Sequence, residues 1–346
     1  MDKVQYFKEA KYGLMIHFGL YSMLAGEYKG KIGPSYAEWI QSYLQIPNFE
    51  MERLASVFNP LYFDAEEIAV FAARCGMKYI VLTAKHHEGF ALFKSFVDKY
   101  NIVDSTPFKR DIVKELSDAC KKHGLKFGFY YSQCLDWHEK HGGGYLTDPK
   151  GAAGPTWENS WDFPDKTKKN YSLTFKTKIL PQIEELLTNY GEIFIAWFDT
   201  PMGLSLEESK IIYNLVKRIQ PDCLVNSRLG NGKYDYVALG DNEIPASIPE
   251  RINYDTDKNS MRGFKHSPYN LYESACTLNN SWGYSVHDRN WKSPETILNN
   301  RLKLERLGIN YLINIGPDWL GRIPAKSQEI LVKVQELYKN NMVCSF

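Results

Sequence analysis

Short apolar runs recur along the chain, and each run ends in polar residues or glycine. Eight of them can be followed, at residues 12–19, 77–89, 125–133, 192–199, 222–228, 236–243, 271–278 and 310–317. The runs are almost continuously apolar rather than alternating, which is typical of strands that are covered on both faces of a parallel sheet. The pattern therefore predicts eight buried, parallel strands.

Most of the segments between these runs have helical periodicity. Apolar residues recur with helical spacing in residues 64–76, 109–124, 176–191, 207–221, 293–308 and 325–340. Strand–helix alternation repeated in this way predicts an α/β fold, a (β/α)8-like TIM barrel. Residues 229–235 are too few for a helix, so one crossover is expected to be degenerate. An open doubly wound sheet would instead need a glycine-rich phosphate turn after the first strand, and IHFGLYS is not one.

Composition limits the domain organisation and the partners. The chain has 346 residues, 44% hydrophobic and 14% aromatic, with no Pro- or Ser-rich linker, so a single domain over residues 1–346 is expected. Its 42 basic and 41 acidic residues give a net charge of +1 without long runs of like charge, so neither nucleic acid nor an anionic membrane is expected as a partner.

Two further features bear on localisation. The N-terminus has no apolar core of a secretory signal, and no run approaches the roughly 18–20 residues needed to cross a bilayer. The six cysteines are scattered without a CxxC pair, as is typical of reduced thiols. These features predict a cytoplasmic protein.

Polar side chains stand near the end of nearly every predicted strand. In chain order they are His17, His86, His87, Tyr131, Trp197, Asp199, Arg228, Asp241, Asn242, Glu243, Glu273 and Asn314. Packing alone does not require such groups at so many strand ends. Because the chemistry of TIM barrels lies at the carboxyl ends of the strands, we expect these residues to converge on one site.

Two kinds of chemistry could use this set. Metal-assisted hydrolysis is suggested by His17 and the KHHEG motif, but adjacent His86 and His87 should point to opposite sides if the strand continues there. A guanidinium would also be unfavourable beside a bound cation, so no metal is expected. The alternative is a pair of carboxylates flanking a glycosidic bond, one ionised and one protonated. Asp199 would stay charged beside Arg228, whereas burial among aromatic residues would raise the pKa of a Glu towards ~6.

Seven short motifs carry a resemblance to a known family. KYGLMIHFGLYS, YAEW, KHHEGF, FGFYYS, AWFD, NSR and YESACTLNNSWGY resemble, in order and along essentially the whole chain, glycoside hydrolase family 29, the retaining alpha-L-fucosidases. The resemblance implies no cofactor, and it implies that Asp199 is the nucleophile. It also implies that fucose is bound by residues in the matching motifs, namely His17, Glu38, Trp39, His86, His87, Tyr131, Trp197, Arg228 and Trp282.

The acid/base residue differs between members of that family. Glu273 lies in the segment that many members use, and we expect it at a strand end beside aromatic residues that would desolvate it. Glu243, in GDNEIP, matches the position used by other members, and Glu38 is a third candidate. Glu243 and its neighbour Asn242 are otherwise expected to bind substrate.

The resemblance also suggests a substrate. The short form without an appended C-terminal β-sandwich, together with GDNEIP, is similar to bacterial enzymes that favour alpha-1,6-linked fucose on N-acetylglucosamine. A fucosylated glycan fragment is therefore the expected partner, and barrel surface left uncovered by a second domain favours a homo-oligomer. Two alternatives remain: a fucose-binding barrel without catalysis, and a metal-dependent hydrolase.

Overall fold

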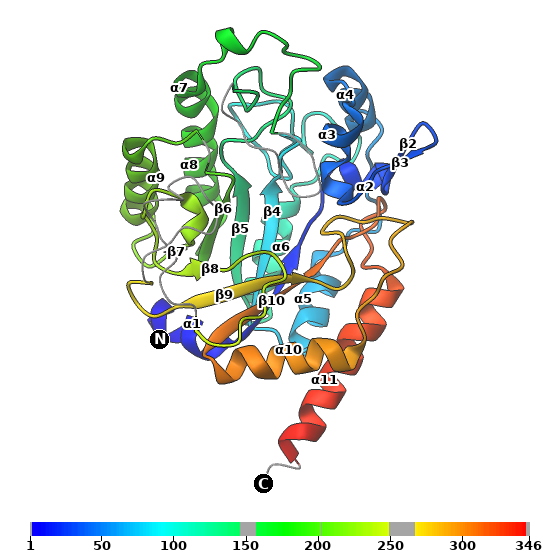
Figure 1. The fold of residues 1–346 in the computed structure, drawn as a ribbon, viewed down its shortest axis with the longest axis vertical. Coiled ribbons are helices and arrows are strands. Elements are labelled where there is room, and N and C mark those ends of the chain that lie inside the picture. Colours follow the sequence, from blue (N-terminus) through cyan, green and yellow to red (C-terminus); the bar gives the residue numbers. More distant parts are fainter. Residues whose placement is uncertain (1, 146–156, 202, 249–266, 344–346) are drawn as a thin grey trace.

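A parallel sheet of eight strands forms the centre of the molecule (Figure 1). The computed structural model describes residues 2–145, 157–201, 203–248 and 267–343. The strands are β1 (Tyr12–Ile16), β4 (Tyr79–Lys85), β5 (Lys126–Ser132), β6 (Ile195–Asp199), β7 (Leu224–Val225), β8 (Val237–Ala238), β9 (Tyr272–Thr277) and β10 (Ile309–Ile315). Their order is β7-β6-β5-β4-β1-β10-β9-β8. Each predicted apolar run overlaps one of these strands, and the barrel-like fold is confirmed.

The two ends of this strand order are joined by a narrow contact. A parallel bridge pairs Asn226 with Tyr236, and the amide of Asp235 donates to the carbonyl of Val225 at 2.8 Å. The crossover from β7 to β8 contains only the 3-10 turn η4 (Ser227–Leu229), as the short 229–235 connection predicts. The β7–β8 joint is therefore the thinnest part of the wall that the structure describes.

Helices pack around the outside of the sheet, and six of them match the predicted segments. They are α5 (Ala65–Arg74), α6 (Ile112–Lys122), α8 (Leu180–Asn189), α9 (Leu206–Ile219), α10 (Pro294–Arg306) and α11 (Ala325–Val343). Side-chain caps begin several of them: Asp64 accepts from the amide of Glu67 at the start of α5, and Ser205 and Glu208 form a capping box at the start of α9. Local sequence therefore sets where these helices start.

Additional short elements surround the two ends of the barrel. Helix α1 (Lys3–Ala10) places Phe7 against Tyr79 and Tyr236 inside the barrel. Between β1 and α5 lie α2 (Tyr21–Leu24), the hairpin β2 (Glu27–Tyr28) and β3 (Lys31–Ile32), η1 (Ala37–Trp39), α3 (Ile40–Leu44) and α4 (Asn48–Ala55). Before α8 lie η2 (Lys166–Lys168), α7 (Tyr171–Thr174) and the π-helical turn η3 (Phe175–Ile179).

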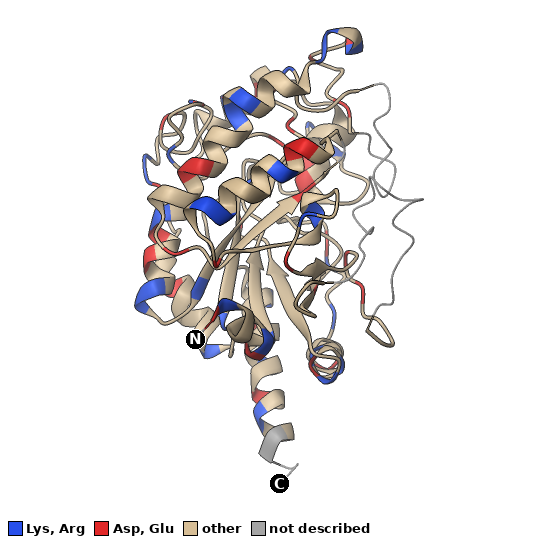
Figure 2. Ribbon diagram, turned by 90° about the vertical axis from the view of Figure 1, so that its left-hand side faces the viewer, with Lys and Arg blue, Asp and Glu red and all other residues tan. Residues whose placement is uncertain are grey.

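Charged residues and cysteines lie mostly in different layers of the molecule. Figure 2 shows acidic and basic residues interspersed on the outer helices and loops. Five cysteines are buried and free, and Cys344 lies outside the described residues. Across the described ranges, no helix combines the length and the apolar character that a membrane span requires.

We expect Asn226→Ala to destabilise the barrel beside β6. The Asn226 side chain accepts from the amide of Phe198 and donates to its carbonyl, both at 2.9 Å, in a fully buried position. Truncation leaves both backbone groups unpaired, so the free energy of unfolding should fall by about 2–4 kcal/mol in denaturant titrations. Asn189→Ala, at the exposed end of α8, should change it by less than about 0.5 kcal/mol. Equal effects of the two changes would contradict this account.

Candidate active site

A pocket opens at the carboxyl ends of the barrel strands. Together with its open mouth it encloses about 620 Å³. Its walls are formed by Met15, His17, Tyr36, Glu38, Trp39, His86, His87, Tyr130, Trp157, Trp197, Asp199, Thr200, Arg228, Asp241 and Trp282. Most of the residues selected from the sequence therefore meet in one place.

Asp199 is the last residue of β6; the residue is 7% exposed and lines this pocket. The Tyr130 hydroxyl donates to Oδ2 at 2.8 Å, and Nη1 of Arg228 lies 3.4 Å from Oδ1. Burial raises the pKa of Asp199, while the Arg228 charge and the Tyr130 hydrogen bond act in the opposite direction. The charged form of Asp199 therefore depends on these two partners.

Arg228 connects two carboxylates. It belongs to η4, is buried, and its guanidinium lies 4.8 Å from the centre of the Trp197 ring. Besides Asp199 it forms a short ion pair with Asp241 through Nη2, and the same nitrogen donates to the carbonyl of Leu239 at 2.9 Å. Asp199 and Asp241 consequently share one cation at the same end of the barrel.

Three histidines form one side of the pocket. Nδ1 of His17 lies 2.7 Å from Oδ1 of Asn314, Nδ1 of His87 lies 2.7 Å from the Ser132 hydroxyl, and the ring centres of His86 and His87 are 3.9 Å apart. Burial lowers the pKa of His17 to about 4 and those of His86 and His87 well below the usual value. All three rings are therefore neutral at pH 7. Nδ1 of His17 donates to Asn314 and Nδ1 of His87 donates to Ser132, which leaves the Nε2 atom of each of these two rings as an acceptor.

The expected opposite orientation of His86 and His87 is wrong. Both rings line the pocket, because β4 ends at Lys85 and the chain turns at once, with the amide of Gly89 donating to the carbonyl of His86. The expectation assumed that the strand continues through His86 and His87, whereas β4 ends at Lys85. Within the described part of the chain, no three His, Cys, Asp or Glu side chains are grouped so that they could hold a metal ion.

Glu38 enters the pocket from η1. Its Oε2 accepts from the amide of Gly283 at 2.8 Å and from the Ser281 hydroxyl at 3.3 Å. Burial raises the pKa of Glu38 to about 7. Its Oε1 is buried and has no hydrogen-bond partner among the residues that the structure describes. This oxygen is therefore an unsatisfied acceptor in the pocket wall.

Trp282 and Trp39 line the same pocket from opposite ends of the histidine row. The Trp282 ring centre lies 5.0 Å from that of His17, and the Trp39 ring centre lies 4.8 Å from that of His87. Trp39 is only partly buried, whereas Trp282 is 6% exposed. Apolar ring surface thus borders the polar groups at both ends of the row.

The prediction for Tyr131 is wrong by one residue. Its side chain points out of the barrel, where its hydroxyl donates to Oε1 of Gln182 at 2.7 Å. Its neighbour Tyr130 faces the pocket, because successive side chains of a strand point to opposite faces.

Glu273 is not at the carboxyl end of a strand, so that expectation is also wrong. It is the second residue of β9, paired in register with Asn310, and it does not line the pocket. Its carboxylate accepts from the Tyr79 hydroxyl at 2.7 Å and from Nε1 of Trp197 at 2.9 Å. Burial raises the pKa of Glu273 to about 7. Because β9 continues to Thr277, Glu273 lies inside the barrel, behind the Trp197 ring.

Asn242 and Glu243 turn away from the pocket. Asn242 has a φ of +58°, and its Oδ1 accepts from the amide of Thr277 and from Nζ of Lys292, both at 2.9 Å. Oε2 of Glu243 accepts from the amide of Gly240 at 2.7 Å. The two side chains instead hold the loop from which Asp241 reaches the pocket.

Several wall residues had no catalytic or binding role predicted from the sequence, namely Met15, Tyr36, Tyr130, Trp157, Thr200 and Asp241. Asp241 stood among the polar strand ends, and strict alternation could have favoured Tyr130. Tyr36 and Trp157 come from irregular segments that no strand pattern links to the pocket.

A family model described as Alpha-L-fucosidase matches residues 2–342. The chain belongs to the alpha-L-fucosidase family. It is thus a glycoside hydrolase. The solved alpha-L-fucosidase AlfC from Lactobacillus casei is 55% identical, with a TM-score of 0.90 and 98% of each chain covered. The alpha-L-fucosidase from Vibrio sp. strain EJY3 is 33% identical, with a TM-score of 0.85, covering 98% of this chain and 55% of that one.

Mammalian relatives are more distant. Tissue alpha-L-fucosidase from Rattus norvegicus is 29% identical over 355 residues, covering 95% of this chain and 67% of that protein. The match nevertheless runs along almost the whole chain, as the order of the sequence motifs predicts.

We expect Tyr130→Phe to shift the pH dependence of turnover. The phenol hydroxyl stabilises ionised Asp199, so its loss should raise the pKa of Asp199 further. The acid limb of kcat/KM for an aryl alpha-L-fucoside should then move to higher pH. Tyr131→Phe, which removes a hydroxyl outside the pocket, is the matched control and should leave that limb in place. A shift in the control alone would contradict this account of Asp199.

Proposed function

We propose that this alpha-L-fucosidase is a retaining exo-enzyme in which Asp199 is the nucleophile and Asp241 is the acid/base. Asp199 would attack the anomeric carbon while Asp241 gives a proton to the leaving glycosidic oxygen. Asp241 would then take a proton from the water that attacks the fucosyl–Asp199 ester, releasing fucose with its configuration retained. The observation that supports this most is the pairing of both carboxylates with the single guanidinium of Arg228.

Position favours Asp241 over the glutamates considered from the sequence. Glu273 lies behind the pocket wall and Glu243 points to a backbone amide. Asp241 lines the pocket with its side chain 39% exposed, so it can reach both the leaving group and entering water. Glu38 also lines the pocket, but it is 1% exposed and one of its oxygens is held by Gly283.

The remaining wall suits a neutral sugar with one apolar corner. The neutral rings of His17 and His87 can accept from hydroxyl groups through Nε2, and the neutral ring of His86 can donate or accept. The buried Glu38 Oε1 offers a further position for a hydroxyl. The indole of Trp282 can cover the C6 methyl group of fucose.

We further propose that the substrate is fucose alpha-1,6-linked to N-acetylglucosamine in a glycan fragment. Tyr36 and Trp39 are only partly buried and line the pocket with the partly exposed Asp241, so the leaving sugar would lie against them. A mutant of the similar AlfC enzyme has been solved in complex with Fuca(1,6)GlcNAc, and that likeness of 55% identity supports the same linkage here.

Azide should separate the two carboxylate roles. Asp199→Gly should lower kcat/KM for 4-nitrophenyl alpha-L-fucoside by about 10³-fold or more, and azide should then give beta-L-fucosyl azide by a single inversion. Asp241→Gly should slow turnover by about 10²- to 10⁴-fold, and azide attack on the fucosyl enzyme should give alpha-L-fucosyl azide. Product configuration is read by NMR.

Three glutamate variants complete this test. Glu38→Ala, Glu243→Ala and Glu273→Ala should yield no fucosyl azide. Formation of alpha-L-fucosyl azide by one of them, and not by Asp241→Gly, would transfer the acid/base role to that residue. A wild-type protein that binds fucose but releases no product from the aryl fucoside would instead support a sugar-binding barrel.

Linkage preference is measured separately with defined fucosyl disaccharides. We expect kcat/KM for fucosyl-alpha-1,6-GlcNAc to exceed those for the 1,2-, 1,3- and 1,4-linked isomers by at least about tenfold, corresponding to ~1.4 kcal/mol at the transition state. An equal rate on the isomers would remove the linkage proposal and leave the fucosidase chemistry intact.

A further inference from the structure

A β-bulge lies directly before the histidine pair. The register between β4 and β5 pairs Thr83 with Tyr130 and then Lys85 with Tyr131, which leaves Ala84 as an extra residue on β4. A bulge of this kind reverses which face the following side chains occupy.

The reversal decides where His86 points. Earlier in β4, Tyr79 and Val81 pack inside the barrel, and Ile80 packs outside. Strict alternation would continue with Lys85 inside and His86 outside. The bulge instead leaves Lys85 outside the barrel, and His86 lines the pocket.

Outside the barrel, Lys85 is fully buried and paired. Its Nζ lies 3.0 Å from Oδ2 of Asp136 and 4.7 Å from the centre of the Tyr131 ring. Asp136 lies in the loop that follows β5, and its Oδ1 accepts from the amide of Glu139 at 3.1 Å. An ammonium group at this depth is tolerated only with a close counter-charge.

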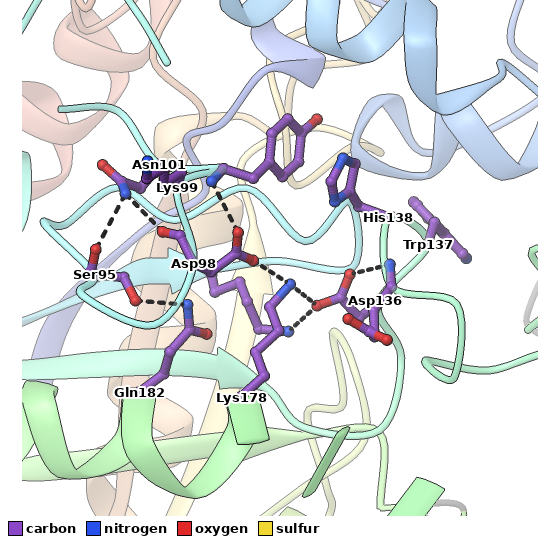
Figure 3. A network of polar contacts seen from close by, with 12 residues as sticks. Ser95, Asp98, Lys99, Asn101, Asp136, Trp137, His138, Lys178 and Gln182 are labelled. Carbon is purple, nitrogen blue, oxygen red and sulfur yellow. Dashed lines mark hydrogen bonds and ion pairs between the residues drawn. The ribbon is translucent and has the colours of Figure 1, made fainter. Parts of the chain in front are cut away.

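Two further charges complete the cluster (Figure 3). Nζ of Lys178, from the π-helical turn η3, lies 2.9 Å from Oδ2 of Asp136 and 2.6 Å from Oδ2 of Asp98. Two ammonium groups and two carboxylates are thus combined without net charge. We call Lys85, Asp98, Asp136 and Lys178 the ion cluster.

The loop of the ion cluster also touches the histidine pair. The amide of Trp137, next to Asp136, donates to the carbonyl of His87 at 2.7 Å. The Ser132 hydroxyl, which contacts Nδ1 of His87, donates to the carbonyl of Leu135 at 2.6 Å in the same loop. Backbone and ring of His87 are therefore both held by the segment that Asp136 anchors to Lys85.

We propose that Lys85 and Asp136 are positioning residues that hold the bulge of β4 and thereby turn His86 and His87 into the fucose site. The ion pair keeps the Lys85 side chain outside the barrel, and the Asp136 loop holds the carbonyl and ring of His87. The inference rests on the proposed role of these histidines in binding fucose.

The kinetic test uses two single variants and their combination. Lys85→Met and Asp136→Asn each leave an unbalanced buried charge, so each should lower Tm and lower kcat/KM for the aryl fucoside roughly 10- to 100-fold. The double variant retains only the balanced Lys178–Asp98 pair and should regain most of the lost Tm. Its kcat/KM should stay low, because the contact that holds the bulge is still missing.

A remote buried cation is the control. Arg301 on α10 is 5% exposed, pairs with Glu305 and stacks on Tyr12, away from the pocket. Arg301→Met should lower Tm with unchanged kcat/KM for the folded fraction. Recovery of both Tm and kcat/KM in the double variant would overturn the proposal, as would single variants that keep wild-type kinetics.

Imidazole NMR gives a readout that does not depend on turnover. In the double variant the ¹⁵N resonances of His86 and His87 should move, whereas in Arg301→Met they should stay as in the wild type. Unchanged resonances in the double variant would overturn the positioning role even if the single variants fail to fold. Movement of these resonances in a protein without fucosidase activity would uphold the positioning role and reject the proposed function.

Discussion

The common direction of the eight strands is the constraint on which the site depends. Because every strand runs the same way, residues that end different strands are brought to one mouth of the barrel. Asp199 on β6 and His17 after β1 are far apart in the chain but share one pocket for this reason. The opposite end of the barrel is filled by aromatic side chains such as Phe7 and Tyr79.

The sequence predicted the features that depend on local pattern. Long apolar runs located the strands, and helical spacing located the outer helices. Asp199 could be placed because its run ends abruptly at a polar residue. The sequence did not show which side chains of a strand face the pocket. In a run such as FGFYYS the residues on both faces are apolar, so Tyr130 and Tyr131 look equivalent, although only Tyr130 enters the pocket.

The sequence also did not show how far along the barrel axis a residue lies. Glu273 lies in an apolar run and was expected at the end of a strand. Its position along the barrel axis is set by pairing with Asn310 on β10, and this is a contact between segments that are distant in the chain. Inside the barrel its carboxylate is satisfied by Tyr79, Trp197 and Tyr236 rather than by a ligand. The bulge at Ala84 is a third example, because nothing in the letters TAKHH marks the point where alternation breaks.

Two separate groups of charged residues lie near the histidine pair: the ion cluster outside the barrel, and Arg228 with its two carboxylates in the pocket. Because they are separate, the ion cluster need not affect the charge of Asp199. A single uncompensated charge roughly 10 Å away would contribute about 1.7 kcal/mol at an effective dielectric constant of 20. The ion cluster has two cations and two anions, so it adds little net field across the barrel wall. The balance of charged and neutral Asp199 is therefore left to its direct partners, Arg228 and Tyr130, and a buried cluster can shape the site without setting its charge.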